Sequence, residues 1–293
     1  MIRQRLFGIL ADYEDQNDHE FLRRDSVFKM IAGRSPDDPK HLAGQSTLSR
    51  FENSIRAKDL QRLRDLLLDQ FIASFQTRPA QITIDIDAFD DPTHGQQQLT
   101  FFHGYYKQFQ YLPIIATCEE NDQVMLVGLR HGTCKPSLGA DDDLTFMVKR
   151  LREVWPDVQI HVRGDCGFGL PLIYETCEKL GIWYTFGLAM NERLKAASED
   201  LLAQAQLQFK ETGEKARLFM SMDYKADKWD SPRTVSIKAE AHSGGTNRRA
   251  VVSNRPGARH FPEATYDDYT QRGESENRNK ELKCGLRAVE MSI

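Results

Sequence analysis

The sequence predicts an α/β fold, a mixed sheet that follows a helical N-terminal region. Three observations predict it: helical periodicity over residues 1 to 76, alternating strand and helix patterns over 77–194, and a β-rich segment over 195–265. A polar helical segment, 266–293, ends the chain. We therefore expect a main α/β core in two parts, 77–194 and 266–293, with a largely β insertion between them.

The first 76 residues have the spacing of amphipathic helices. Large apolar residues recur at intervals of three and four, with charged residues on the other faces. These apolar positions are Leu60, Leu63, Leu67, Phe71 and Phe75. Residues 45–53 are typical of a short capped helix. The pattern fits a DNA-binding module and equally a helical support for the next domain.

The core begins with a strand of strict alternation. Ile82, Ile84 and Ile86 share one face, and Thr83, Asp85 and Asp87 share the other. The segments after it are predicted in the order strand, strand, helix, strand, helix, strand: 111–118, 123–130, 141–155, 158–165, 170–180 and 183–188. Mixed sheets with helices on their faces pack this order of elements economically.

The predicted insertion starts with a polar helix over 196–209. Three strand-like runs follow it, at 217–224, 234–240 and 249–253. After residue 265 the residue pattern is again that of a helix, one that carries few apolar residues. We interpret the segment as a unit placed between the sheet and that last helix.

The overall composition excludes several classes of protein. The net charge is -4, so any nucleic-acid site must be a local patch. The five cysteines are an odd number without a Cys-x-x-Cys pair, which favours a reducing cytosol over a disulfide or structural zinc framework. No apolar run approaches the roughly 18 residues of a membrane span, so we expect a cytoplasmic protein that does not enter membranes.

Three acidic residues stand where a cation site is expected. Asp87 lies at the end of the first strand, Asp165 ends the fourth, and Glu276 lies on the polar helix. Carboxylate oxygens are the ligands that Mg²⁺ prefers, and Mg²⁺ shares them with substrate phosphates. Asp85 points to the same face as Asp87 and is a rival for the first position. The glycines at 164, 167 and 169 predict space for a substrate beside Asp165.

The last helix places polar residues where a core seam is expected. Tyr269, Arg272, Glu276 and Lys283 fall on one stripe. From 272 to 287 the segment holds five basic residues (272, 278, 280, 283 and 287) and three acidic ones (274, 276 and 281). This local positive patch fits phosphate binding; the alternative is a surface helix with ordinary charge pairs.

Several of these segments together resemble a known family. They are residues 85–98, Phe102-His-Gly-Tyr-Tyr106, Arg163-Gly-Asp-Cys-Gly-Phe168, residues 187–194 and the spacing Tyr269, Arg272, Glu276, Lys283. The combination resembles the DDE transposases of bacterial insertion sequences, in the branch with the Tyr-Arg-Glu-Lys signature (transposase DDE domain group one). Family members usually extend further at both ends, so the resemblance implies a chain truncated at both ends.

The resemblance implies a ribonuclease-H-like fold and a metal-dependent DNA reaction. It implies that Asp87, Asp165 and Glu276 are the catalytic residues and the ligands of two Mg²⁺ ions, which Mn²⁺ can replace. The implied reaction hydrolyses phosphodiesters at the element ends and transfers the 3′-hydroxyl into target DNA. Family members commonly have Asp-x-Thr at the first aspartate, and Phe89 departs from this.

The resemblance also implies partners and further site residues. Terminal inverted repeats and target DNA are the implied partners, in a paired-end complex of two copies in the bacterial cytoplasm, on the nucleoid when bound to DNA. The implied DNA-binding residues are Tyr269, Arg272, Lys283, Arg278 and Lys280, since Arg suits bidentate and Lys point-charge phosphate contacts.

Other functions are weaker. A truncated, inactive remnant that binds DNA or only folds is the main alternative. A glycosidase also uses paired carboxylates, but the sequence has no identifiable aromatic sugar platform. The tripeptide Arg163-Gly-Asp165 would serve cell adhesion only in a secreted, exposed loop, whereas here it ends an apolar strand.

Overall fold

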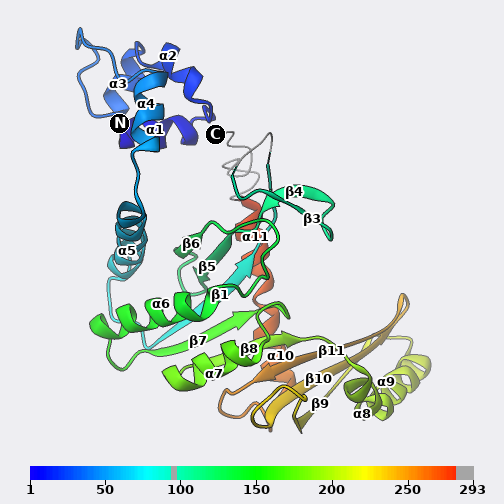
Figure 1. Ribbon diagram of the computed structural model, residues 1–293. Helices are drawn as coiled ribbons and strands as arrows, with labels where there is room; N and C mark the ends of the chain where they lie inside the picture. The colour runs from blue at the N-terminus through cyan, green and yellow to red at the C-terminus, as the bar shows by residue number, and fades with distance from the viewer. Residues whose placement is uncertain (94–97, 282–293) are drawn as a thin grey trace.

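A computed structural model describes residues 1–93 and 98–281. Its centre is an eight-stranded mixed sheet in the order β6-β5-β1-β7-β8-β11-β10-β9 (Figure 1). The first five strands along the chain in this sheet are β1 (Gln81–Ala88), β5 (Ile114–Cys118), β6 (Val124–Gly128), β7 (Gln159–Gly164) and β8 (Trp183–Leu188). Strands β5 and β6 are antiparallel to their neighbours, while β7 and β8 continue parallel to β1. This order and these directions confirm the ribonuclease-H-like fold.

The predicted insertion extends the same sheet. Strand β11 (Gly245–Ser253) pairs antiparallel with β8, and β10 (Arg233–His242) and β9 (Ala216–Tyr224) add beyond it. The single polar helix predicted over 196–209 is two helices, α8 (Glu192–Ala197) and α9 (Glu199–Thr212). Helix α9 packs on β9 and β10.

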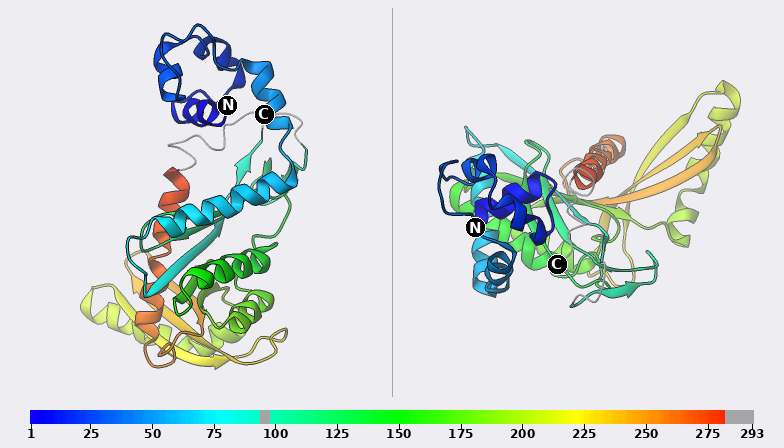
Figure 2. Two further views of the ribbon diagram at one scale, coloured as in Figure 1. Left: turned by 90° about the vertical axis from the view of Figure 1, so that its left-hand side faces the viewer. Right: turned by 90° about the horizontal axis from the view of Figure 1, so that it is seen from above.

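One face of the sheet is apolar and carries the main core. Ile82, Ile84 and Ile86 are fully buried there. Helices α5 (Ala57–Ala73), α6 (Ala140–Val154) and α7 (Pro171–Leu180) cover this face (Figure 2). Their apolar stripes join one continuous cluster with the isoleucines, so burial of apolar area holds these layers together.

Helix α5 joins the core only through its second half. Leu68 and Phe71 are buried, whereas Leu60 and Leu63, predicted on the apolar face, are exposed. The first half of α5 runs away from the sheet toward the N-terminal helices (Figure 1). The periodicity therefore predicted the helix correctly but not how far along it the contact with the sheet extends.

The N-terminal region is helical, as expected. It contains α1 (Ile2–Leu10), η1 (Gln16–Asp18), α2 (His19–Leu22), α3 (Ser26–Ile31) and α4 (Gln45–Asn53). Its small core consists of Leu22, Phe28 and Leu42. No helix in the described ranges is both long and apolar enough to cross a membrane.

The opposite face of the central strands is polar and buried. Thr83, Asp85, Thr117, His161, Arg163, Thr185 and Ser253 are each at most 2% exposed. Hydrogen bonds connect them: His161 Nε2 lies 3.0 Å from Thr185 Oγ1, which lies 2.9 Å from Ser253 Oγ. Burial keeps the pKa of His161 well below 6.5, so this network contains a neutral imidazole.

Two helices cover this polar face, α10 (Pro262–Thr270) and α11 (Gly273–Lys280) (Figure 2). The continuous helix predicted through Tyr269 and Lys283 is therefore interrupted. At Gln271 and Arg272 the backbone makes i→i−3 hydrogen bonds, such as Arg272 N–H to Tyr269 O at 3.1 Å, and Gly273 follows. Glycine weakens a helix at this point, and burial of the Arg272 side chain fixes the turn.

A second, small sheet lies at the end of β1. It consists of β2 (Asp91–Pro92), β4 (Gln108–Tyr111) and β3 (Phe101–His103), in that order. Lys107 in the β3–β4 turn has φ +56, a left-handed conformation stabilised by its N–H bond to His103 O. This hairpin stands beside the carboxyl ends of β1 and β7 (Figure 1).

Candidate active site

Asp87 and Asp165 lie at the same edge of the sheet. Asp87 is the last residue but one of β1, and Asp165 follows β7 directly. The strands are parallel and paired from Gln81 with Gln159 to Ile86 with Gly164. The carboxyl ends of neighbouring parallel strands meet at one edge, so the two aspartates border the same cavity.

Asp85, the rival first carboxylate, has a structural role. Both of its oxygens accept hydrogen bonds from Arg163, at 2.7 and 2.9 Å, and both side chains are fully buried. Arg163 also bonds Glu119 and the backbone oxygen of Asp268 in α10. This bidentate pair fastens α10 to the middle of the sheet, and it uses the lone pairs that a metal would need.

The Asp87 carboxylate has a strained electrostatic environment. Burial, with smaller contributions from the negative charges of Asp165 and Glu276, raises its pKa to about 6, against the attraction of Arg272. Its Oδ2 accepts a bond from Asn279 Nδ2 at 3.0 Å. Asp165 and Glu276 are thus both close enough to Asp87 for their charges to raise its pKa.

Arg272 lies between two of these acids. Its Nη1 donates to Glu276 Oε1 at 3.1 Å, and its Nη2 lies 3.9 Å from Asp87 Oδ1. Arg272 is 8% exposed, while the Glu276 side chain is 68% exposed. Within residues 1–93 and 98–281, no group of three His, Cys, Asp or Glu residues is close enough to hold a metal ion. In this structure Arg272, at the start of α11, and Asn279, within it, link this helix to Asp87.

The buried face of α11 consists of polar residues that bind the sheet. Asn279 bonds Asp87, as described above, and Ser275 is fully buried. Arg278 pairs with Asp122 and lies 3.5 Å from Asp85 Oδ2. This packing explains why the helix carries so few apolar residues.

The five predicted DNA-binding residues do not share one environment. Arg272 and Tyr269 line a cavity, Arg278 is bound to two carboxylates, and Lys280 is exposed. Lys283 lies outside the described residues. DNA contacts by these five side chains stay predictions.

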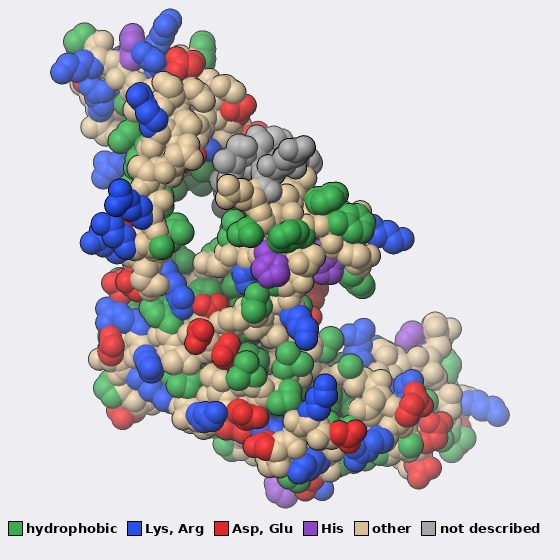
Figure 3. Space-filling view, viewed as in Figure 1, with side chains coloured by type: hydrophobic (Ala, Val, Ile, Leu, Met, Phe, Trp, Pro, Cys, Tyr) green, Lys and Arg blue, Asp and Glu red, His purple; other side chains and the backbone are tan. Residues whose placement is uncertain are grey.

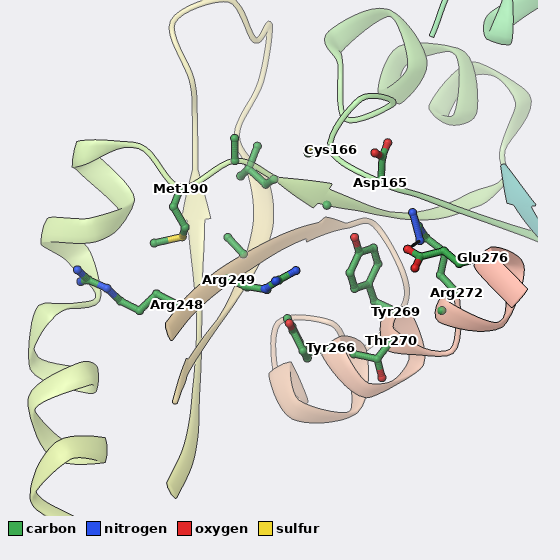
Figure 4. A pocket seen from close by; sticks show the side chains of 15 residues that line it. Asp165, Cys166, Met190, Arg248, Arg249, Tyr266, Tyr269, Thr270, Arg272 and Glu276 are labelled. Carbon is green, nitrogen blue, oxygen red and sulfur yellow. Dashed lines mark hydrogen bonds and ion pairs between the residues drawn. The ribbon is translucent and has the colours of Figure 1, made fainter. Parts of the chain in front are cut away.

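Two cavities meet at Asp165. One of about 530 Å³ lies between Asp165, Tyr269, Arg272 and Glu276 on one side and Arg249 of β11 on the other. Figure 4 shows these side chains coming from the end of β7, from α10, from the start of α11 and from β11, with Arg249 reaching toward Tyr269. The other cavity, of about 340 Å³, lies on the hairpin side and is bordered by Asp87 and Asp165. Asp165 therefore faces both.

The glycines near Asp165 provide close packing rather than open space. A Cβ on Gly164 would meet Ile86 and Phe186, and one on Gly169 would lie 2.5 Å from a backbone oxygen. The expectation that Gly164 and Gly169 leave room for a substrate is therefore wrong. Gly167 has a different part, since its N–H donates to Asp165 Oδ1 at 2.8 Å and orients that carboxylate.

A substitution at Gly187 tests how closely α10 packs against β8. A Cβ at this position would lie 2.7 Å from the Tyr269 hydroxyl oxygen and 2.9 Å from the Cys166 backbone nitrogen. We expect Gly187→Ala to lower the free energy of unfolding by about 1–3 kcal/mol, because neither neighbour can move freely. Urea denaturation measures the change.

Gly273→Ala is the matched control, since nothing lies within 4 Å of its added Cβ. It is expected to stabilise α11 by up to about 1 kcal/mol. Equal stability of the Gly187→Ala variant and the parent chain would contradict the close approach of Tyr269 to β8.

Sequence reasoning missed three residues of this site. Asn279, Arg163 and Arg249 contact or face the acidic groups. Arg163 stood in a motif of the family resemblance, but that motif gave it no role of its own. The spacing of Arg272, Ser275 and Asn279 at three and four residues was the available signal for the buried face of α11.

The strand order and the acids at its edge define a ribonuclease-H-like domain with an acidic site. The chain belongs to the Transposase DDE domain group 1 family, whose model matches residues 1–293. This match confirms the resemblance found in the sequence as far as a DDE transposase family. No curated protein sequence matches the chain.

Solved structures with a similar fold are distant. The piggyBac transposase synaptic complex with hairpin DNA matches at 12% identity, over 95% of this chain and 58% of that chain, with a TM-score of 0.46. Endonuclease V of Ciona intestinalis in complex with inosine-containing DNA matches at 9% identity, over 78% and 99% of the two chains, with a TM-score of 0.34. The Mos1 transposase paired-end complex matches at 11%, over 60% and 57%, with a TM-score of 0.25. The present chain thus spans little more than half of the piggyBac chain.

Proposed function

We propose that this protein is a DNA transposase that cleaves phosphodiesters at the ends of a mobile element and joins the freed 3′-hydroxyl to target DNA. The observation that supports the proposal is that Asp87 and Asp165 border one cavity at the edge of the sheet, Asp165 and Glu276 border the next, and both Asp165 and Glu276 help to raise the pKa of Asp87 to about 6. Family membership supports this reaction. The insertion-sequence origin of the chain belongs to the same proposal.

The three carboxylates have the chemistry of ligands for a hard divalent cation, but in this structure Arg272 lies between Asp87 and Glu276, and no three such groups of the described residues are close enough together to hold one. Asp87 and Asp165 supply carboxylates from neighbouring strand ends, Glu276 supplies a third, and such oxygens suit Mg²⁺ or Mn²⁺. Bound there, two such ions would supply Lewis-acid activation of water and of the scissile phosphate. We propose Asp87 rather than Asp85 as the first carboxylate, because Arg163 occupies both oxygens of Asp85.

Arg272 reduces the repulsion between the carboxylates while no cation is bound. Its charge lies between Asp87 and Glu276, which offsets repulsion between carboxylates in a buried site. Its Nε has no hydrogen-bond partner among the described residues. We propose that Arg272 turns from these carboxylates to a DNA phosphate, for which a planar guanidinium is well suited.

The DNA is proposed to run through the 530 Å³ cavity. Arg249 is exposed at its far wall, and Arg272 lies at its near wall. Arg248, the neighbour of Arg249, is instead bound to the Lys195 backbone oxygen and to Glu199. Terminal repeats and target DNA are the proposed partners, with two copies of the chain pairing the two ends.

A cleavage assay tests the proposal. Duplexes carrying the DNA that flanks the gene are incubated with the protein and MgCl₂, and nicks are mapped on gels. Strand cleavage that EDTA abolishes and MnCl₂ restores is the expected result. DNA binding without cleavage in either metal would show instead an inactive remnant, the alternative function.

A further inference from the structure

Strand β9 forms one edge of the eight-stranded sheet, at the bottom of the view in Figure 1. It pairs with β10 over all of its nine residues and without a bulge. In the described part of the chain, no backbone hydrogen bond joins the other side of β9 to a loop. An edge of this length, with its backbone groups open, is a template for a further strand.

The sequence of β9 has none of the residues that usually protect an edge strand. Residues 216–224 contain no proline, glycine or lysine. The opposite edge of the sheet, β6, is five residues long, its pairing with β5 is irregular at Ala116 and Thr117, and α5 packs on it. Short and irregular strands are poor templates, so β9 is the edge that suits pairing with another chain.

One face of β9 is apolar and only partly covered. Met220 and Met222 are half-buried against the main core, and Leu218 packs in the same way against the small cluster under α9. A strand added to this edge would remove more of their apolar surface from water.

The other face of β9 carries one charge of each sign. Arg217 Nη2 lies 2.6 Å from Asp267 Oδ1, and Asp223 Oδ2 lies 3.9 Å from Arg259 Nη2. The side chains of Arg217 and Asp223 are 37% and 65% exposed, so both are accessible to a partner. Figure 3 shows acidic and basic side chains together along this lower margin of the molecule.

We propose that β9 pairs antiparallel with β9 of a second copy of this chain, about a two-fold axis at Met220. This register pairs all nine residues, because Ala216 then lies opposite the partner subunit's Tyr224. Side chains alternate along a strand, so each face meets the same face of the partner. Arg217 therefore lies opposite the partner subunit's Asp223, and the symmetry repeats this contact.

The charge pattern favours a second copy over a peptide of another protein. Opposite charges stand at equal distances from the centre of the strand, which is what an isologous pairing needs. The lysines that flank the strand are held within the chain, Lys215 by Glu240 and Lys225 by the Asp230 backbone oxygen. The inference goes beyond the proposed function, because this pairing requires neither DNA nor a cation.

Sedimentation in EDTA and without DNA tests the pairing. The parent chain is expected to form a dimer that dissociates on dilution. Arg217→Asp alone, or Asp223→Arg alone, places like charges opposite each other twice and should raise the dissociation constant about 10- to 100-fold. An equimolar mixture of the two variants should dimerise like the parent chain, because one chain then carries two acidic and the other two basic side chains at these positions.

Glu211→Arg is the matched control. It makes the same change of charge as Asp223→Arg at an exposed position of α9, away from the strand, and should dimerise like the parent chain. Hydrogen exchange of residues 216–224 should slow as the parent dimer forms, since edge amides become paired. A parent chain that stays monomeric, a mixture that restores no dimer, or a dimer with unchanged exchange in β9 would overturn the inference.

Failure of the two proposals is distinguishable. A monomeric parent chain that cleaves duplexes with Mg²⁺ would overturn the β9 pairing alone. A parent chain that dimerises through β9, with the mixture of variants restoring the dimer, but cleaves no DNA would confirm the pairing and contradict the proposed reaction.

Discussion

Replacing Asp87 by asparagine is expected to abolish strand cleavage and, at the same time, to stabilise the metal-free protein. The carboxylate is a proposed metal ligand, so cleavage should fall by more than about 100-fold. Stability should rise because burial and two neighbouring acids oppose the negative charge of Asp87. An asparagine keeps an oxygen for the Asn279 amide and removes that charge.

The sign of the pH dependence follows from the raised pKa. The folded-state pKa of Asp87 is about 6 and its ordinary value is 3.8, so the folded protein holds this proton more tightly. The stability that this proton gives is complete below about pH 4 and is lost as the pH rises through 6. The free energy of unfolding of the Asp87→Asn variant should therefore exceed that of the parent chain by up to about 3 kcal/mol above pH 6, and by little below pH 4.

Urea denaturation in EDTA between pH 4 and 8 measures this difference, and cleavage of a labelled duplex measures the activity. Asp142→Asn is the control, because Asp142 is exposed at the start of α6, on the other face of the sheet. Its stability profile should follow that of the parent chain. A destabilised Asp87→Asn variant at pH 8 would show that the carboxylate is a structural group.

Replacing Arg163 by glutamine should produce the largest loss of stability. Arg163 and Asp85 are both fully buried and are joined by two hydrogen bonds. Removing one partner of a buried ion pair leaves the other charge unpaired, which costs about 3–5 kcal/mol. Helix α10 would also lose the bond from Arg163 to the Asp268 backbone oxygen.

The urea midpoint at pH 7 checks this prediction. Arg150→Gln is the matched control, since Arg150 pairs with Asp69 at the surface and should contribute less than about 1 kcal/mol. An Arg163→Met/Asp85→Leu double variant should recover part of the loss, because it leaves no buried charge behind. A loss no larger than that of Arg150→Gln would refute the structural assignment of Asp85.

Most of the fold was predictable because apolar periodicity reports burial directly. The alternation at Ile82, Ile84 and Ile86 predicted β1, and the helical spacing predicted α6 and α7. Long-range pairing was not predictable in this way. No local pattern shows that β11 pairs with β8, or that only the second half of α5 meets the sheet.

The types of residue in the site were predictable from the sequence, but their positions in space were much less so. Asp85 and Asp87 are equivalent in an alternating strand, and only the position of Arg163 on the neighbouring strand separates them. The break of the last helix at Gln271 and Arg272 depends on tertiary burial of Arg272, which propensity does not report. The same burial explains the polar stripe: its residues bind carboxylates of the sheet.

Asp87, Asp165 and Glu276 are proposed to serve one cation site. Crystals soaked in MnCl₂ and measured for anomalous scattering would test this proposal. We expect Mn²⁺ in contact with all three carboxylates, with the Arg272 side chain turned away from Asp87. Manganese elsewhere on the molecule, or none at these residues, would contradict it.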